Sequence, residues 1–154
     1  MLFRSACGGT HRLFGLTWAY FLHRQRGGKK AGIWKDLADK LEHYQQVAKK
    51  TQNADGSFST DYLKGPGNNR DPQTRIGTTG HILEWLALYL ADDELKAGWI
   101  QEAAGSLSLM ILGSHDRDIE GGALYHATHG LHLYHARTYG DPKAKSPVPS
   151  PPRD

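Results

Sequence analysis

Histidine is unusually frequent in this sequence, with nine residues in 154. Four of them follow one another at three-residue intervals, at His126, His129, His132 and His135. Residues three apart share a helix face, so His126 and His129 form one pair, and the other two form a second pair rotated from the first. An imidazole with a near-neutral pKa can act as an acid, a base or a metal ligand.

A metal site would need a third ligand beside such a pair. The residues that could supply it are His81, His11, Cys7 and Glu120. The sequence contains no recognised zinc-binding spacing such as His-Glu-x-x-His, so it predicts no metal and no cofactor. The first histidine pair is expected to line a cavity, and the second to face water or to pack.

A polar pocket is better supported than a metal site. Its candidate ligand-binding residues are His11, Arg12, His81, Glu84, Tyr125, His126 and His129. Arg12 supplies a fixed charge, and a histidine oriented by Glu84 or Tyr125 could transfer protons. The candidate catalytic residues are His81 and His126, and an anionic or polyhydroxylated ligand suits the set. A structural interpretation stays equally open, in which these groups cap helix starts and hydrogen-bond one another.

Cys7 lies four residues before His11. A helix N-terminus lowers the pKa of a thiol, so a Cys–His nucleophile is conceivable. The favoured interpretation is a small buried residue at a close helix contact.

Five helices are expected to position these residues, because apolar residues recur at three- and four-residue spacing between breakers. They span residues 10–25, 32–50, 78–90, a stretch from just after the N-cap pair Asp92-Asp93 to residue 112, and 121–138. The second and fourth helices are amphipathic, as outer helices should be, whereas the others follow glycine clusters and carry few acids. Residues 1–139 are thus one helical domain, and the proline-rich tail 140–154 is expected to be disordered.

A weak internal repeat links the three inner helices. Aligning His11, His81 and His126 also aligns Leu16 with Leu86 and Leu131, five positions later. A repeat of about 50 residues is typical of an array of helical hairpins.

The segment Gln52-Asn53-Ala54-Asp55-Gly56-Ser57-Phe58 resembles the Gln-to-Asp-Gly-Ser-Trp/Phe signature of squalene cyclases and related toroid proteins. The glycine-led helices carrying histidine are similar to inner helices of protein prenyltransferase β subunits. The resemblance implies an all-α fold in which antiparallel helical hairpins form part of an α/α toroid. In that family the glutamine caps a helix end, Asp-Gly makes a tight turn and the aromatic residue packs between hairpins.

The resemblance does not settle the activity. The acid-rich motif of squalene cyclases is not visible, and Ser5 stands where prenyltransferases place an aspartate two residues before a zinc-binding cysteine. Toroid relatives also include polysaccharide lyases, glycosidases and catalytically silent modules. Two hypotheses follow: a module that binds a small molecule, a carbohydrate or a partner, and a fragment of an isoprenoid or carbohydrate enzyme that uses histidine acid–base chemistry.

Composition limits the partners. The net charge is only +3, without a long basic block, so nucleic acid is not expected, and no apolar stretch is long enough to cross a membrane. A single cysteine excludes an intrachain disulfide, and a cytoplasmic location is expected. A complete ring would need roughly twice this length, so the chain is expected to be a partial or C-terminal fragment that self-associates or pairs with a missing N-terminal half.

Overall fold

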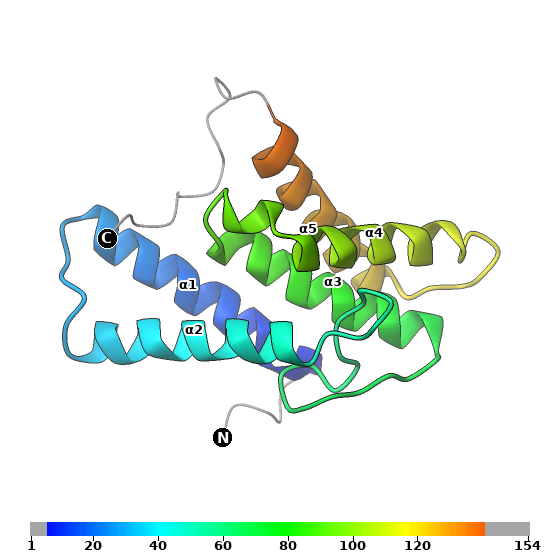
Figure 1. Cartoon of the computed structure of the whole chain (residues 1–154), viewed down its shortest axis with the longest axis horizontal. Helices are drawn as coiled ribbons and strands as arrows, with labels where there is room; N and C mark the ends of the chain where they lie inside the picture. Colours follow the sequence, from blue (N-terminus) through cyan, green and yellow to red (C-terminus); the bar gives the residue numbers. More distant parts are fainter. Residues whose placement is uncertain (1–5, 141–154) are drawn as a thin grey trace.

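The computed structural model of the chain describes residues 6–140, which form five α-helices and two short 3-10 helices and contain no β-strand. The expected all-α class is therefore confirmed (Figure 1). Within the described residues no helix is long and apolar enough to span a membrane. The elements in chain order are η1 (Ala6–Gly9), α1 (Thr10–Gln25), α2 (Ile33–Lys50), α3 (Pro72–Tyr89), η2 (Glu94–Lys96), α4 (Gly98–Leu112) and α5 (Gly121–Tyr139).

Helix α3 is the centre of the fold (Figure 1). It packs most extensively against α5 and also contacts α1 and α4, whereas α2 packs beside α1. Every residue from Ile76 to Leu88 is buried, so α3 is covered on all sides. A helix buried all round needs an apolar sequence with few charges, and the only charged residue of this stretch is Glu84.

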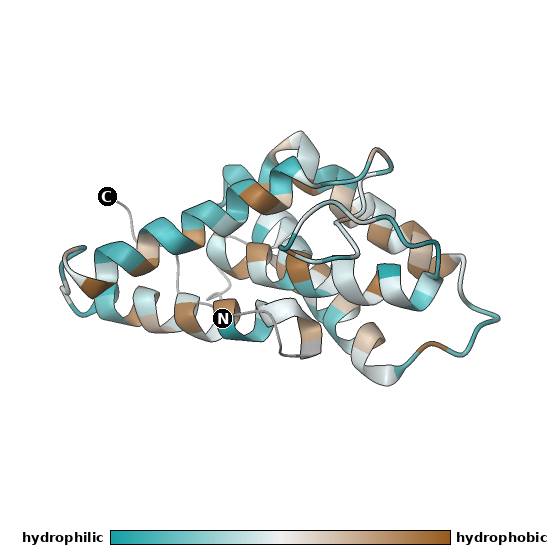
Figure 2. Cartoon of the chain, turned by 90° about the horizontal axis from the view of Figure 1, so that it is seen from below, coloured by the Kyte–Doolittle hydropathy of each residue, from teal (hydrophilic) through white to brown (hydrophobic). Residues whose placement is uncertain are grey.

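Helix α2 has the opposite character, because it covers the core with one face only. Its buried residues Ala38, Leu41, Tyr44 and Ala48 recur at three- and four-residue spacing, and charged side chains occupy the other face. Figure 2 shows hydrophilic and apolar residues alternating in this way along the helices. The predicted amphipathic character of α2 is thus confirmed by its burial pattern.

The start of the third helix was predicted wrongly, because α3 begins at Pro72 and not at residue 78. Asp71 accepts hydrogen bonds from the Thr74 backbone N–H and hydroxyl at 2.9 and 2.6 Å, and proline suits the first helical position. Consequently Gly77 and Gly80 lie inside the helix and do not open it.

The predicted capping role of Asp92-Asp93 is also wrong. In the described chain, no side-chain cap is made by Asp93, and η2 separates it from α4. Helix α4 begins at Gly98, after Ala97. The other three helices start and end within one residue of their predicted bounds. The predicted tail lies outside the described residues except for Gly140.

Small residues let α3 and α5 approach closely. A Cβ placed on Gly80 would stand 2.7 Å from the backbone of Ala127, and one on Gly130 would stand 2.9 Å from the Glu84 backbone nitrogen. No side chain larger than hydrogen fits at either position without moving a helix. This close approach brings Glu84 of α3 up to the histidine-bearing face of α5.

The segment 52–58 joins α2, α3 and α4. The Gln52 side chain donates hydrogen bonds to the carbonyls of Gly56 and Trp99 at 2.8 and 2.7 Å. Gly56 has a φ of 83°, which favours glycine, and its N–H donates to the Asn53 carbonyl to close the turn. Phe58 is buried, and its N–H donates to the Thr79 hydroxyl of α3 at 3.2 Å. The turn and the packed aromatic residue that the resemblance implied are both present.

Candidate functional site

Three histidines from three different helices meet at one end of the fold. The ring centroids of His81 and His126 are 3.9 Å apart, those of His11 and His126 are 4.7 Å apart, and those of His11 and His81 are 5.1 Å apart. The Nε2 atoms of His11 and His126 are separated by 3.1 Å. Residues 115 positions apart in the sequence are thus brought into hydrogen-bonding distance.

Glu84 fixes two histidines at once. One carboxylate oxygen lies 2.8 Å from Nδ1 of His126, and the other lies 2.5 Å from Nδ1 of His129. A carboxylate can only accept hydrogen bonds, so each Nδ1 must carry the proton. His126 is therefore held with its Nε2 lone pair directed away from Glu84, and Nε2 is the atom that faces His11.

His81 is fixed by its own helix. Its Nδ1 lies 2.6 Å from the Gly77 carbonyl, one turn earlier in α3. The carbonyl must accept, so Nδ1 carries the proton and Nε2 has a free lone pair. That Nε2 is buried and has no hydrogen-bond partner among the described residues. Orphaned buried polar atoms are rare, and each calls for an explanation.

A cavity of about 390 Å³ opens beside these imidazoles. Its lining includes His81 and His126 together with hydroxyl, amide, carboxyl and thiol groups from Thr60, Tyr62, Gln73, Thr74, Thr78, Glu120 and Cys7. The volume falls within the range of small-molecule sites, about 300–1,000 Å³. The cavity is thus large enough for a ligand of a few rings or sugar units and rich in groups that could orient it.

Cys7 and Tyr62 on the cavity wall share an uncommon backbone conformation. They are the two non-glycine residues in the described chain with positive φ, at 68° and 57°. The left-handed region costs energy for side chains larger than glycine, and such residues gather at functional sites. Gly8, which follows Cys7, lies directly against the Tyr62 ring, so the loop between α2 and α3 packs closely on the chain before α1.

Burial controls the protonation of the cavity wall. It lowers the pKa of His81 to about 4, and the nearby imidazoles of His126 and His11 act in the same direction. Burial also raises the pKa of Tyr62 to about 12, with Cys7 contributing. The pKa of the Cys7 thiol is raised by burial and by the carboxylates of Glu120 and Glu84. At neutral pH the wall therefore presents a neutral imidazole, a phenol and a thiol, which does not favour a free Cys7 thiolate as nucleophile.

The remaining candidate residues do not line the cavity. Tyr125 is exposed, and its ring stacks on His129 with centroids 5.7 Å apart. His129 in turn contacts Glu84. Arg12 is exposed and is not among the described residues that line the cavity. His132 and His135 are exposed, as expected for the second histidine pair.

Several cavity residues had no recognisable signal in the sequence. Thr60 and Tyr62 belong to the loop between α2 and α3, and nothing in their spacing indicates that the loop folds back over His81. Gln73 and Thr74 were missed because the start of α3 was placed too late, at residue 78. Thr78 lay within the predicted helix but was not named as a site residue. Of the cavity-lining residues, the sequence had indicated His81 and His126 as candidate site residues, and Cys7 and Glu120 as conceivable metal ligands.

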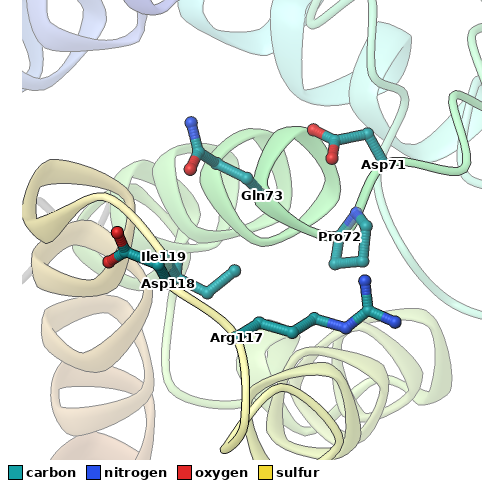
Figure 3. A pocket seen from close by; sticks show the side chains of 6 residues that line it. All are labelled: Asp71, Pro72, Gln73, Arg117, Asp118 and Ile119. Carbon is teal, nitrogen blue, oxygen red and sulfur yellow. The ribbon is translucent and has the colours of Figure 1, made fainter.

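A smaller hollow of about 240 Å³ lies beside the cavity, where the loop before α5 passes the start of α3 (Figure 3). Gln73 lines both spaces, and its side-chain oxygen accepts a hydrogen bond from the Glu120 backbone at 3.2 Å. The Asp71 carboxylate in this hollow already caps α3. Of these two hollows, the histidine cavity is the stronger candidate, because its lining includes the buried titratable residue His81.

We expect the stability of the chain to depend on His81 in mildly acidic solution. Its pKa is near 6.5 when unfolded and about 4 when folded. The unfolded state therefore binds more protons in this range, so the free energy of unfolding should be fully present above pH 6.5 and should fall as the pH is lowered toward 4. Urea unfolding at a series of pH values measures the slope. His81→Gln should flatten it and the exposed-site control His132→Gln should retain it; equal slopes in all three proteins would contradict the assignment to His81.

Comparison with protein-family models, curated proteins and solved structures finds no match to this chain.

Proposed function

We propose that this chain is part of an α/α toroid whose histidine cavity binds a small polyhydroxylated molecule and acts on it by proton transfer. The observation that carries the proposal is the meeting of His11, His81 and His126, of which His81 and His126 line a cavity that also presents several polar groups, with His126 fixed by a buried carboxylate. Imidazoles that served only as helix caps would not need to meet around open space.

The toroid part of the proposal is supported by the order of the helices. Helix α3 contacts both α1 and α5, while α2 packs on α1 and α4 packs on α3 and α5. These contacts are compatible with the proposal that α1, α3 and α5 are inner helices and that α2 and α4 are outer helices.

The choice of ligand follows from the cavity wall. Hydroxyl and amide groups of Thr60, Gln73, Thr74 and Thr78 suit the hydroxyls of a sugar better than the hydrocarbon chain of an isoprenoid. The proposed base is Nε2 of His126: Glu84 accepts the hydrogen bond from the opposite ring nitrogen, Nδ1, so in the neutral ring the free lone pair is on Nε2. Tyr62 remains protonated at neutral pH, so its phenol supplies a donor on the same wall.

We expect sugars to bind the cavity and His126 to be needed only for their conversion. Glucose, glucuronate and oligosaccharides of each would be tested by saturation-transfer NMR, with geranyl diphosphate as the apolar-chain alternative. Gln73→Ala should weaken sugar binding, because it removes an amide from the wall. His126→Ala should keep binding but lower the turnover of the bound oligosaccharide, followed by product NMR signals, by roughly 100-fold or more.

His132→Ala provides the matched control, because this histidine lies on the same helix but is exposed and away from the cavity. It should bind and convert sugars as the unaltered chain does. Binding of geranyl diphosphate alone, no binding of any sugar, or equal turnover in His126→Ala would each overturn the proposal.

A further inference from the structure

We propose that Cys7, His11 and His81 bind a thiophilic divalent metal ion, best matched by Zn²⁺, at the wall of the histidine cavity. Each of these residues places one ligand atom within 4.8 Å of the corresponding atoms of the other two. In a tetrahedral zinc site with one sulfur and two nitrogens, neighbouring ligand atoms lie roughly 3.3–3.5 Å apart, from Zn–N and Zn–S bond lengths of about 2.0 and 2.3 Å. Side-chain movements of about 1 Å therefore suffice to close the site.

His81 has the features of a metal ligand before any metal is added. Metal-binding histidines commonly donate one ring N–H to a backbone carbonyl or carboxylate, which fixes the tautomer and leaves the other nitrogen for the metal. His81 makes this contact to the Gly77 carbonyl at 2.6 Å. Its other nitrogen is the buried atom that lacks a partner in the described chain. A bound cation would explain both observations.

Cys7 and His11, the other two proposed ligands, are positioned by η1 and the start of α1. The left-handed backbone at Cys7 is secured by the Thr10 hydroxyl, which donates to the Cys7 carbonyl at 2.8 Å. His11 follows in the first turn of α1. A thiolate with two imidazoles selects zinc and similar ions over Mg²⁺ or Ca²⁺, which prefer oxygen ligands. The carboxylates of Glu84 and Glu120 act electrostatically on Cys7 and would favour a cation there.

Three protein ligands leave one tetrahedral position open, as in catalytic zinc sites. Cys7 and His81 both line the cavity, so the open position would face the space where a ligand binds. His126, whose Nε2 is 3.1 Å from that of His11, would stand beside this position. The inference deepens the proposed function by naming a metal for the same cavity, but it does not depend on which molecule binds there.

The test is metal binding by the full chain, measured without any substrate. The protein would be stripped with a chelator, reloaded with Zn²⁺ or Co²⁺, dialysed and analysed for metal content. We expect one metal per chain and a thiolate-to-cobalt absorption band. Cys7→Ser should abolish the band, and Cys7→Ser and His81→Ala should each weaken zinc affinity by roughly 100-fold or more, because each removes a direct ligand. His132→Ala should leave both unchanged.

Far-UV circular dichroism shows whether each variant is folded. If His81→Ala does not fold, the Cys7→Ser variant alone tests the metal site. No retained metal in the unaltered chain, or metal binding that survives Cys7→Ser with the same affinity, would overturn the inference. A chain that binds sugar but no metal refutes only the metal site. A chain that binds metal through Cys7 but no sugar refutes only the proposed function.

Discussion

Replacing Trp85 by alanine will lower the free energy of unfolding by about 3–5 kcal/mol, the usual cost of truncating a buried tryptophan. Trp85 is fully buried in the middle of α3 and stacks on Tyr89 with ring centroids 5.6 Å apart. Its indole N–H donates to the Thr17 hydroxyl of α1 at 3.1 Å, so the side chain also ties α3 to α1. Urea unfolding followed by circular dichroism measures the loss.

Two matched variants separate the parts of this effect. Thr17→Val removes only the hydroxyl that accepts from Trp85 and should cost about 1–3 kcal/mol, because it leaves a buried N–H unpaired. Trp18→Ala truncates a half-buried tryptophan of α1 and should cost less than Trp85→Ala. Equal losses for the two tryptophans would show that α3 is not the centre of the core.

Gly80→Ala is expected to destabilise the fold by about 2 kcal/mol although alanine is the better helix former. The added methyl would lie 2.7 Å from the backbone of Ala127, which cannot rotate away as a side chain could. Helix α5 must therefore shift from α3, and this movement would lengthen the contact between Glu84 and His126. Unfolding measurements report the first effect, and the NMR signal of the His126 Nδ1 proton reports the second.

Gly105→Ala is the matched control, since Gly105 also lies inside a helix. A Cβ there would meet no atom of the described chain within 4 Å, apart from its chain neighbours and its own helix backbone. The same substitution should then raise the free energy of unfolding by roughly 0.5–1 kcal/mol through helix propensity alone. Changes of the same sign at both glycines would contradict the close packing of α3 on α5.

The sequence predicted the helices where local patterns decide them. In α2 the apolar spacing of Leu41, Tyr44 and their neighbours fixes both the element and its buried face. The prediction failed at Asp71-Pro72, because the glycines and prolines before it also signal a loop, and only the bond to Thr74 shows where the helix begins. It failed at Asp93 because the short 3-10 helix η2 follows this residue, and α4 begins only after it.

The site was predictable only in its helical part. The alignment of His11, His81 and His126 follows from the repeat, and the structure brings these three together. The roles of Cys7 and Tyr62 depend on left-handed backbone conformations that no residue pattern announces. The sequence also did not indicate which residues contact Glu84, because its contacts with two histidines require the close crossing of α3 and α5.

The cavity wall is formed partly by helices and partly by a loop. His81 and His126 stand on packed helices, whereas Thr60 and Tyr62 come from the loop between α2 and α3. Loops accept substitutions and insertions more readily than buried helices do. If the cavity binds a ligand as proposed, substitutions in this loop would change which molecule is bound while leaving the imidazole arrangement unchanged.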